Sequence, residues 1–466
     1  MFNSFLSNNK LISIRTSSKT FTFRELFIKS FSKSLLLKRI LYNSEKYIPV
    51  LISNSSVFIE NILALWILGK CPVCLNTRWT SEEIKEILRF YNFRNIIYGE
   101  EYKDLLEGLD IVKIEADIQT NGISDLPDFK IDAENNAIII FTSGSSDKPK
   151  AVVHTFNSIF NSVFNSQEIL ELKPGDKILA SLPFYHIGGF QIITRALLNG
   201  CEIIIPDNLS IASISDAIKN FKPTHLSLVS TQLKRLIDSN ISPDKNIKST
   251  LLGGGFIEDE LIQSADELGW KPFRVYGSSE TGSLITSANP KEIKNKPNTV
   301  GKPLKNCELK ISEDGEILIS SNSLFKGYLI KDFNIQKTFK DNFYPSSDIG
   351  FIDSDGYLFI ESKRTDLIIT GGENVNPFEV EKHILKIDGV KEVCVFPKSD
   401  SEWGHSIAAA IVATKAISNE YIIEFLRGKL AGFKIPRIFY FVDSLPKISI
   451  DKIDRKKVIE LFQKNN

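Results

Sequence analysis

Short apolar runs alternate with segments of helical periodicity over most of the chain that precedes residue 302. Residues 57–69 carry apolar side chains at helical spacing and end at a glycine, and the apolar run 71–75 follows directly. The apolar run 136–142 precedes a further helical pattern that begins near residue 157, and the run 202–206 follows another. Because strands that alternate with helices pair in parallel, this pattern predicts an α/β fold built on doubly wound sheets.

The pattern changes in the last third of the chain. Residues 307–320 have the pattern of two short strands joined by Asp314-Gly315, a pair typical of a tight turn. Further on come a helical pattern at 377–386, apolar runs at 390–397 and 407–413, and a helical pattern at 419–430. We therefore expect a large N-terminal domain of residues 1–364 that includes a β-rich subdomain, and a small α+β C-terminal domain of residues 365–466.

Composition excludes several kinds of partner. Lysine plus arginine and aspartate plus glutamate both number 57, so no net field favours binding to nucleic acid. No apolar stretch approaches the roughly 20 residues that cross a membrane, and the N-terminal segment lacks the pattern of a signal peptide. The Cys71-Pro-Val-Cys74 motif lies in an apolar run, which favours core packing over metal or redox chemistry. We expect a cytoplasmic protein with small-molecule partners, no nucleic acid and no membrane span, while its oligomeric state stays open.

The segment 141–154, FTSGSSDKPKAVVH, lies between an apolar run and a helical pattern. Hydroxyl and glycine residues form an unbroken series from Thr142 to Ser146, and lysines follow. Such a loop offers backbone N–H groups, hydroxyl donors and positive charge without bulk, which are the groups that bind a polyphosphate. A hydrophilic turn without a ligand is the alternative. The spacing differs from the Gly-x4-Gly-Lys-Ser/Thr loop of common nucleotide triphosphatases.

This segment resembles the Thr-Ser-Gly-Thr-Thr-Gly-x-Pro-Lys-Gly motif of adenylate-forming enzymes, the family of acyl-CoA synthetases, luciferases and peptide-synthetase adenylation domains. The resemblance implies that the phosphates of ATP are bound by Thr142, Ser143, Gly144, Ser145, Ser146 and Lys150. Asp147 and Ala151 stand where the motif has glycine. Because a carboxylate repels phosphate, Asp147 is expected to weaken ATP binding or to turn the loop outward.

A second motif, Tyr276-Gly277-Ser278-Ser279-Glu280, resembles the Tyr-Gly-x-Thr-Glu of the same family. The resemblance implies that Tyr276 packs on adenine, that Ser279 touches the α-phosphate and that Glu280 binds Mg2+ for catalysis, with Gly277 between them. A flat ring, a hydroxyl and a hard oxygen suit these three ligands. Upstream, the Gly253-Gly254-Gly255 segment resembles the family loop that lines the adenine and acyl pockets, where glycine allows close approach to a ligand.

Three motifs nearer the C-terminus resemble family motifs in the same order. Ser347-Asp348-Ile349-Gly350 resembles Thr-Gly-Asp-x-Gly, which implies that Asp348 accepts hydrogen bonds from both ribose hydroxyls. Residues 362–366 resemble Gly-Arg-x-x-Asp, which implies a ribose contact from Lys363 and a hinge at Thr365. Residues 445–455 resemble Leu-Pro-x-Thr-x-x-Gly-Lys-Ile-x-Arg, which implies that Lys452 catalyses adenylation, whereas a solvated lysine is the ordinary alternative in a charged segment.

The acyl pocket is expected near residues 183–191, 225–232 and 253–256. Residues 182–189 resemble a Leu-Pro-Leu-Phe-His-x-x-Gly stretch of small-acid ligases, which implies that His186 lies at the pocket wall; a core histidine is the alternative. Residues 224–236, 75–78 and 402–405 resemble stretches of the o-succinylbenzoate:CoA ligases of menaquinone biosynthesis. The candidates for contact with the acid are His186, Ser227, Thr231, Gln232 and Gly254.

Together the resemblances extend from residue 48 to residue 455. They imply an enzyme that uses ATP, Mg2+ and CoA to activate a carboxylic acid as its acyl-AMP and to transfer the acyl group to CoA. The acid implied is 2-succinylbenzoate. Ligation of another aryl or fatty acid, loading of a carrier protein, and binding without catalysis are the alternatives; the presence of Glu280, Asp348 and Lys452 favours catalysis.

Overall fold

The computed structural model describes residues 11–41, 45–118, 130–142, 149–255, 257–313, 315–362, 367–449, 452–453 and 455–463. The chain packs into two compact units. Unit 1 comprises Met1–Thr77, Tyr91–Phe141 and Ala151–Lys363, and unit 2 comprises Arg78–Phe90, Thr142–Lys150 and Arg364–Asn466. Within the described ranges, no helix is both long enough and apolar enough to cross a membrane.

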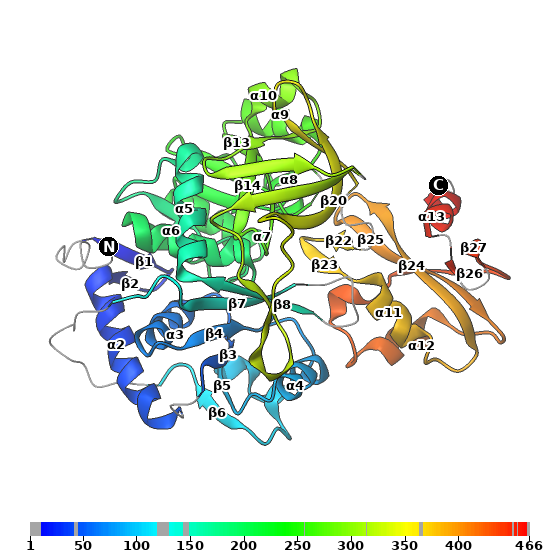
Figure 1. Cartoon of the computed structure of the whole chain (residues 1–466), viewed down its shortest axis with the longest axis horizontal. Coiled ribbons are helices and arrows are strands. Elements are labelled where there is room, and N and C mark those ends of the chain that lie inside the picture. The colour runs from blue at the N-terminus through cyan, green and yellow to red at the C-terminus, as the bar shows by residue number, and fades with distance from the viewer. Residues whose placement is uncertain are drawn as a thin grey trace. The chain divides into compact units, whose positions relative to one another are not determined.

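Eight strands of the described chain form one sheet of unit 1, in the order β19-β18-β8-β7-β4-β3-β5-β6 (Figure 1). They are β3 (Tyr47–Leu51), β4 (Cys71–Cys74), β5 (Asn95–Tyr98), β6 (Val112–Glu115), β7 (Asn136–Thr142), β8 (Lys150–Thr155), β18 (Gly327–Leu329) and β19 (Ile335–Gln336). Strands β3 to β7 pair in parallel, with Val73 opposite Ile139. Cys71 and Cys74 are buried in β4, and burial raises the pKa of both thiols. The predicted core packing of this motif is confirmed.

Thirteen described strands form the second sheet of unit 1, in the order β16-β17-β20-β21-β15-β14-β13-β12-β11-β9-β10-β1-β2. They are β1 (Ile12–Arg15), β2 (Thr20–Thr22), β9 (Lys177–Leu179), β10 (Glu202–Ile204), β11 (His225–Leu228), β12 (Ser249–Leu252), β13 (Pro272–Ser278), β14 (Ser283–Ala288), β15 (Thr299–Pro303), β16 (Cys307–Ile311), β17 (Glu316–Ser321), β20 (Tyr344–Ile352) and β21 (Leu358–Ser362). Strands β1 and β9 to β13 pair in parallel, and the strands after β13 pair antiparallel.

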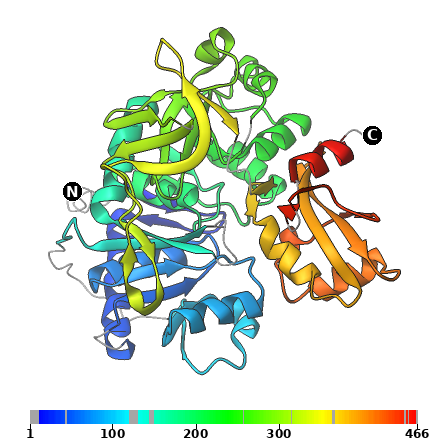
Figure 2. The ribbon, with the colours of Figure 1, turned by 45° about the vertical axis from the view of Figure 1, so that its right-hand side comes forward.

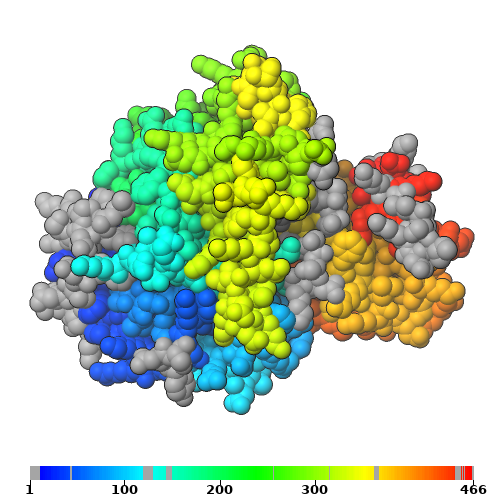
Figure 3. Space-filling view, in the orientation of Figure 1, coloured from blue at the N-terminus to red at the C-terminus, as the bar shows by residue number. Residues whose placement is uncertain are grey.

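The predicted β-rich part is therefore an extension of this large sheet. Its β16–β17 hairpin is confirmed, with Gly315 at a φ of 84° in the turn. Strand β18 leaves this part and pairs with β8 of the other sheet, and β19 pairs with β18, so one segment joins the two sheets. Figure 3 shows this segment, in yellow, at the surface of unit 1.

Helices cover the sheets of unit 1 (Figures 1 and 2). They are α2 (Phe23–Ile40), α3 (Ser56–Ile67), α5 (Phe156–Leu170), α6 (Ile187–Asn199), α7 (Ile211–Phe221), α8 (Ser230–Asp238), α9 (Asp259–Glu267) and α10 (Pro290–Asn295), with short 3-10 turns at Glu100–Tyr102, Asp104–Leu106 and Lys331–Phe333. Side chains alternate along the strands: Leu251 faces the core that includes α3, α5 and α6, and Leu252 faces the core that includes α7, α8 and α9. The large sheet is thus covered on both faces, as its parallel strands require.

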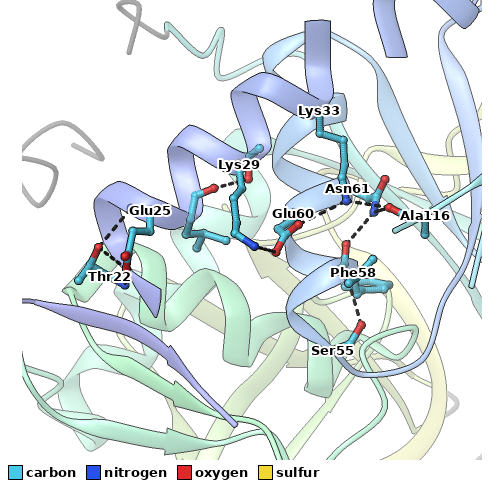
Figure 4. Close-up of polar contacts among 12 residues, drawn as sticks. Thr22, Glu25, Lys29, Lys33, Ser55, Phe58, Glu60, Asn61 and Ala116 are labelled. Carbon is cyan, nitrogen blue, oxygen red and sulfur yellow. Dashed lines mark hydrogen bonds and ion pairs between the residues drawn. The ribbon is translucent and has the colours of Figure 1, made fainter. Parts of the chain in front are cut away.

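Buried polar contacts fix helix α2 to helix α3 (Figure 4). Lys33 Nζ lies 3.3 Å from Glu60 Oε2 and donates to the Ala116 carbonyl at 2.7 Å. Asn61 Nδ2 donates to the same carbonyl at 3.2 Å. Ser55 caps α3, because its hydroxyl accepts from the N–H of Phe58 at 3.2 Å. These contacts fix α3 against α2 and against the residue that follows β6.

Unit 2 has its own core. Its strands are β22 (Ile368–Thr370), β23 (Glu373–Val375), β24 (Val390–Asp400), β25 (Gly404–Ala413), β26 (Ile438–Phe441), β27 (Lys447–Ser449) and β28 (Lys452–Ile453); its helices are α4 (Ser81–Phe90), α11 (Pro377–Ile384), α12 (Asn419–Leu426) and α13 (Arg455–Gln463), with a 3-10 turn at Gly432–Lys434. Lys434 is buried and pairs with Glu83 of α4 at 2.6 Å and Glu379 of α11 at 2.9 Å. Helix α12 is shorter than predicted: it ends at Leu426 because Arg427 leaves the helical conformation and Gly428, at a φ of 75°, turns the chain.

Candidate active site

Four neighbouring parallel strands, β9, β11, β12 and β13, end at the same edge of the large sheet. They lead into residues 180–186, into helix α8, into the Gly253 segment and into residues 279–282, respectively. We call residues 180–186 the β9–α6 loop and residues 279–282 the β13–β14 loop. Because the carboxyl ends of parallel strands meet at one edge, all four connections lie there, which is where ligands bind in open α/β sheets. Each connection carries residues predicted from the sequence.

Tyr276 and Asp348 come from different strands and meet directly. The Tyr276 hydroxyl, near the end of β13, donates to Asp348 Oδ2 at 2.6 Å. Both residues are buried, and the N–H of Asp348 donates to Ser346 Oγ at 3.1 Å. The ring of Tyr276 offers a surface on which the base of a nucleotide can pack. The carboxylate of Asp348 offers two acceptor oxygens for the ribose hydroxyls of the same nucleotide.

Two backbone features surround this pair. Ser347 has a φ of 63°, in the left-handed region that favours glycine, and its N–H donates to Glu316 Oε1 at 2.8 Å. This explains why the family motif has glycine at the position of Ser347. A Cβ on Gly277 would lie 1.7 Å from the carbonyl oxygen of Ser283, so glycine at this position is required by the close approach of β13 and β14.

Glu280 is 1% exposed, and its Oε1 accepts from the hydroxyl of Tyr328 at 2.9 Å. Across the described part of the chain, no group of three or more His, Cys, Asp or Glu side chains could hold a metal ion by itself. Mg2+ commonly takes one or two protein carboxylates and completes its coordination with water and substrate phosphates. Glu280 therefore fits a Mg2+ ion that is bound jointly with a nucleotide.

The β9–α6 loop is held at its start by Asn54. Asn54 Nδ2 donates to the carbonyl of Leu182 at 2.8 Å, and Asn54 Oδ1 accepts from the N–H of Phe184 at 2.8 Å. A Cβ on Gly189 would lie 2.0 Å from the carbonyl oxygen of Pro183, so the first turn of α6 packs closely on the same loop. His186 is the N-cap residue of α6, and its ring centroid lies 4.6 Å from that of Tyr185. These contacts fix the backbone that carries His186 at the carboxyl edge.

The other predicted contacts to an acid lie along the same edge. Gln232 joins two connections, because its Oε1 accepts from the N–H of Val229 at 3.1 Å and its Nε2 donates to the carbonyl of Ser181 at 3.0 Å. Ser227 is buried near the end of β11, and its carbonyl accepts from Ser181 Oγ at 2.6 Å. Thr231 lies in the first turn of α8, and Gly254 has a φ of 83°. Contacts from these residues to the acid remain predictions.

Arg195 is a feature of helix α6 that sequence reasoning missed. The residue is 2% exposed, and burial lowers the pKa of its guanidinium to about 10. Its Nε and Nη2 have no hydrogen-bond partner among the described residues. Arg195 lies near the C-terminal end of α6, which leads to the start of β10, and it interacts electrostatically with His225 at the start of β11, so it lies away from the connections at the carboxyl edge. The available signal was a lone charge in the apolar stretch IITRALL.

Several predicted residues are not brought to this site by the described structure. Thr142 ends β7, Lys150 begins β8, and Lys452 lies in β28 opposite Ser449. Gly255 follows Gly254 in the connection after β12. Outside the described residues lie Ser143, Gly144, Ser145, Ser146, Asp147, Lys363 and Thr365. Their roles remain predictions.

Known proteins resemble this chain over most of its length. The family model described as AMP-binding enzyme matches residues 7–329, and the model described as AMP-binding enzyme C-terminal domain matches residues 379–452. The 2-succinylbenzoate–CoA ligase of Bacillus velezensis is 30% identical, over 97% of this chain and 95% of its own length. That of Staphylococcus epidermidis is 31% identical, also over 97% of this chain and 95% of its own length.

Solved structures give the same result. The o-succinylbenzoate CoA synthetase of Bacillus subtilis, as a double mutant bound to a product analogue, matches with a TM-score of 0.91 at 26% identity, over 98% of both chains. The same synthetase in complex with ATP and magnesium matches with a TM-score of 0.73 at 26% identity, over 98% of both chains. The family models cover most of the chain, from the strands of unit 1 to the segment that contains Lys452, and the chain belongs to the AMP-binding enzyme family.

Proposed function

We propose that this protein is an ATP-dependent acid–thiol ligase that converts 2-succinylbenzoate to its CoA thioester through an acyl-AMP intermediate. The observation that carries the proposal is the buried contact between Tyr276 of β13 and Asp348 of β20, together with the buried carboxylate of Glu280 four residues after Tyr276. Relatives that match over nearly their whole length are 2-succinylbenzoate–CoA ligases. One matching structure of the Bacillus subtilis synthetase contains the acyl-adenylate intermediate, and another contains ATP and magnesium.

The first half-reaction needs alignment and charge neutralisation more than covalent participation by the protein. The substrate carboxylate attacks the α-phosphorus of ATP, the bond to the β-phosphate oxygen breaks, and pyrophosphate leaves. Tyr276 and Asp348 would hold the base and the ribose, while the hydroxyl of Ser279 would contact the α-phosphate. A Mg2+ ion bound by Glu280 would neutralise phosphate charge. Lys452 would contribute a cation to the same transition state.

The second half-reaction transfers the acyl group from AMP to the sulfur of CoA. The C–S bond forms and the C–O bond to AMP breaks, so AMP leaves with the electron pair and the proton of the thiol is released to solvent. We propose that residues 365–466 move as a domain about Thr365 between the half-reactions, relative to residues 1–364. Single-turnover assays of each step test this: Thr365→Pro should slow thioester formation more than adenylation, and equal losses would contradict the hinge.

The second carboxylate of 2-succinylbenzoate requires a cation or several donors in the acyl pocket. Ser227 lies near the end of β11 and Thr231 lies in the first turn of α8, and both offer hydroxyl donors at the carboxyl edge. We propose that these two residues bind this carboxylate. Thr231→Val should raise the KM for the acid without changing the KM for ATP. An unchanged KM for the acid would remove Thr231 from the pocket.

We also propose that the protein acts in the cytoplasm. Its five cysteines are free thiols in the structure, four of them buried, which suits a reducing compartment. Cell fractionation with an antibody against the protein tests this placement, and recovery in a secreted fraction would contradict it.

Pyrophosphate release across a panel of acids, with and without CoA, tests the proposed function. Release that depends on 2-succinylbenzoate and leads to CoA consumption supports it. Pyrophosphate release that depends on another aryl or fatty acid would show that this acid is the substrate. Release without CoA transfer favours a carrier-loading protein, and no release with any acid favours a binding protein without catalysis.

A further inference from the structure

The β13–β14 loop, which carries Ser279 and Glu280, has a hydrogen bond on every carbonyl oxygen. The donors come from strand β8, from helices α5 and α6, and from the segment that follows β17. They are His154 Nε2 to Ser279 at 2.7 Å, the Phe325 N–H to Glu280 at 2.8 Å, Ser323 Oγ to Thr281 at 3.0 Å, and Ser162 Oγ and Gln191 Nε2 to Gly282 at 2.7 and 2.9 Å. Four short carbonyl contacts in succession leave the loop little freedom to rotate any of its peptide planes.

His154 holds the carbonyl that lies directly before Glu280. Its side chain is fully buried near the end of β8, 125 residues away in sequence from its partner Ser279. Because a carbonyl oxygen only accepts, Nε2 must carry the proton, and Nδ1 lies 2.9 Å from the hydroxyl of Ser158 at the start of α5. Both ring nitrogens are thus engaged and the orientation of the ring is fixed. Burial lowers the pKa of His154 to about 4, so the ring is neutral near pH 7.

The hydrogen bond between His154 and Ser279 lies directly beside the two side chains proposed to bind ATP and Mg2+. A peptide plane links the Ser279 carbonyl to the N–H of Glu280, so rotation at Ser279 would reorient both the Ser279 hydroxyl and the Glu280 side chain. On the other side, Glu280 is held by the Tyr328 hydroxyl at 2.9 Å. His154 and Tyr328 therefore fix the backbone and the carboxylate of this loop from two separate strands, β8 and β18.

We propose that His154 is a positioning residue for nucleotide binding: by holding the Ser279 carbonyl, it sets the direction in which Ser279 and Glu280 present their oxygens to ATP and Mg2+. The inference rests on the proposed function, since it assigns the nucleotide to this loop. His154 itself need not touch the nucleotide.

His225 is a matched control within the same unit. It is also buried, its Nε2 donates to the carbonyl of Leu170 at 2.8 Å, and its Nδ1 lies 2.8 Å from Thr224 Oγ1. Burial lowers its pKa too. The two histidines make the same pair of polar contacts, but the carbonyl that His225 holds belongs to the end of α5. If His154 had only a general structural role, replacing His154 or His225 would have the same effect on the Kd for ATP.

The experiment measures the Kd for ATP in the presence of Mg2+ by calorimetry, together with the thermal midpoint, for wild type, His154→Leu, His154→Gln and His225→Leu. Removing a contact that aligns ligand groups should raise the Kd for ATP of His154→Leu by about tenfold to a hundredfold. His154→Gln keeps an N–H donor and should recover part of the loss. His225→Leu should lower the thermal midpoint but leave the Kd for ATP within about twofold of wild type.

Equal Kd values for His154→Leu and His225→Leu would overturn the proposal, as would a His154→Gln variant that binds no better than His154→Leu. If His154→Leu does not fold, Ser158→Ala replaces it, because it removes the hydroxyl that orients the ring; unchanged ATP binding in that variant would count against the proposal. Wild-type protein that binds no ATP would contradict the proposed function instead. The two failures are thus distinguishable.

Discussion

The β13–β14 loop and the β9–α6 loop both lie at the carboxyl edge of the large sheet, but they are held differently. The first has all four of its carbonyls bonded, by partners that include His154 and Ser162. In the second, the side-chain amides of Asn54 and Gln232 hold the carbonyls of Leu182 and Ser181, and Gly189 packs closely on Pro183. The loop proposed to bind the nucleotide is therefore held at every carbonyl, whereas side chains hold only part of the loop proposed to face the acid.

The proposed function assigns recognition of ATP to the first loop and recognition of the acid to the second. Changes around the β13–β14 loop should alter the use of ATP, and changes around the β9–α6 loop should alter the use of the acid. A KM that moves for both substrates in one variant would show that the two loops act as a single unit.

The largest effect is expected from a residue that belongs to neither loop. Lys452→Ala should lower the rate of acyl-AMP formation by about 10²–10³, the scale for losing one focused electrostatic donor. Transfer from supplied acyl-AMP to CoA should be largely retained, because that step does not neutralise a leaving pyrophosphate. Rapid-quench assays of the two steps measure this. Lys447→Ala, in the adjacent strand β27, is the matched control, and equal losses in both variants would remove Lys452 from the reaction.

The next effect concerns the nucleotide side. Asp348→Asn removes the charge that accepts from Tyr276 and would accept from ribose. Since hydrogen bonds to charged groups contribute about 1.5–3 kcal/mol each, the KM for ATP should rise by roughly ten- to a hundredfold. Steady-state kinetics with ATP varied at saturating acid measure it. A rise confined to the KM for the acid would contradict the assignment of Asp348.

A smaller effect should separate the acyl side from the nucleotide side. Asn54→Ala leaves the carbonyl of Leu182 and the N–H of Phe184 without their partner, so the β9–α6 loop should loosen at a cost of about 1–3 kcal/mol. The KM for the acid should rise about tenfold while the KM for ATP is unchanged. Asn61→Ala loses one contact within α3, to the carbonyl of Val57, and one to the carbonyl of Ala116 (Figure 4), and it should destabilise the protein without moving either KM. Identical kinetics in both variants would show that Asn54 only stabilises the fold.

The smallest effect tests backbone strain beside Asp348. Ser347→Gly should stabilise the protein by up to about 1 kcal/mol, because glycine adopts a φ of 63° without the penalty of a Cβ. Urea denaturation measures the free energy of unfolding. Lys222→Gly, at a φ of 52° after α7, gives the matched substitution away from the site. Destabilisation by Ser347→Gly alone would show that the side chain of Ser347 makes a contact worth more than the strain.

The sequence predicted the parts of the fold that depend on local patterns. Helix α3 and strand β4, the β16–β17 hairpin, and strands β24 and β25 of unit 2 follow from periodicity and turn residues. The end of α12 was predicted four residues too late, because the apolar residues after Leu426 continue the helical pattern while Gly428 turns the chain. The β-rich part belongs to the large sheet because strands that are distant in the sequence pair with each other. No local sequence pattern predicts such pairing.

The candidate site divides in the same way. Tyr276 and Asp348 were predicted from separate motifs, and the structure places them in direct contact. His154 lies 125 residues from Ser279, and Asn54 lies 128 residues from Leu182. Each is an ordinary polar residue in its own segment. Residues that bind a ligand can be found from their chemical type and spacing, whereas residues that position them are identified only once the chain is folded.

The most direct test of the central claim is the product itself. Incubation of the protein with 2-succinylbenzoate, ATP, Mg2+ and CoA should yield 2-succinylbenzoyl-CoA and AMP in equal amounts, measured together by mass spectrometry and chromatography. Omission of CoA should leave acyl-AMP bound to the protein. Formation of ADP in place of AMP, or no thioester with an ATP-competent protein, would contradict the claim.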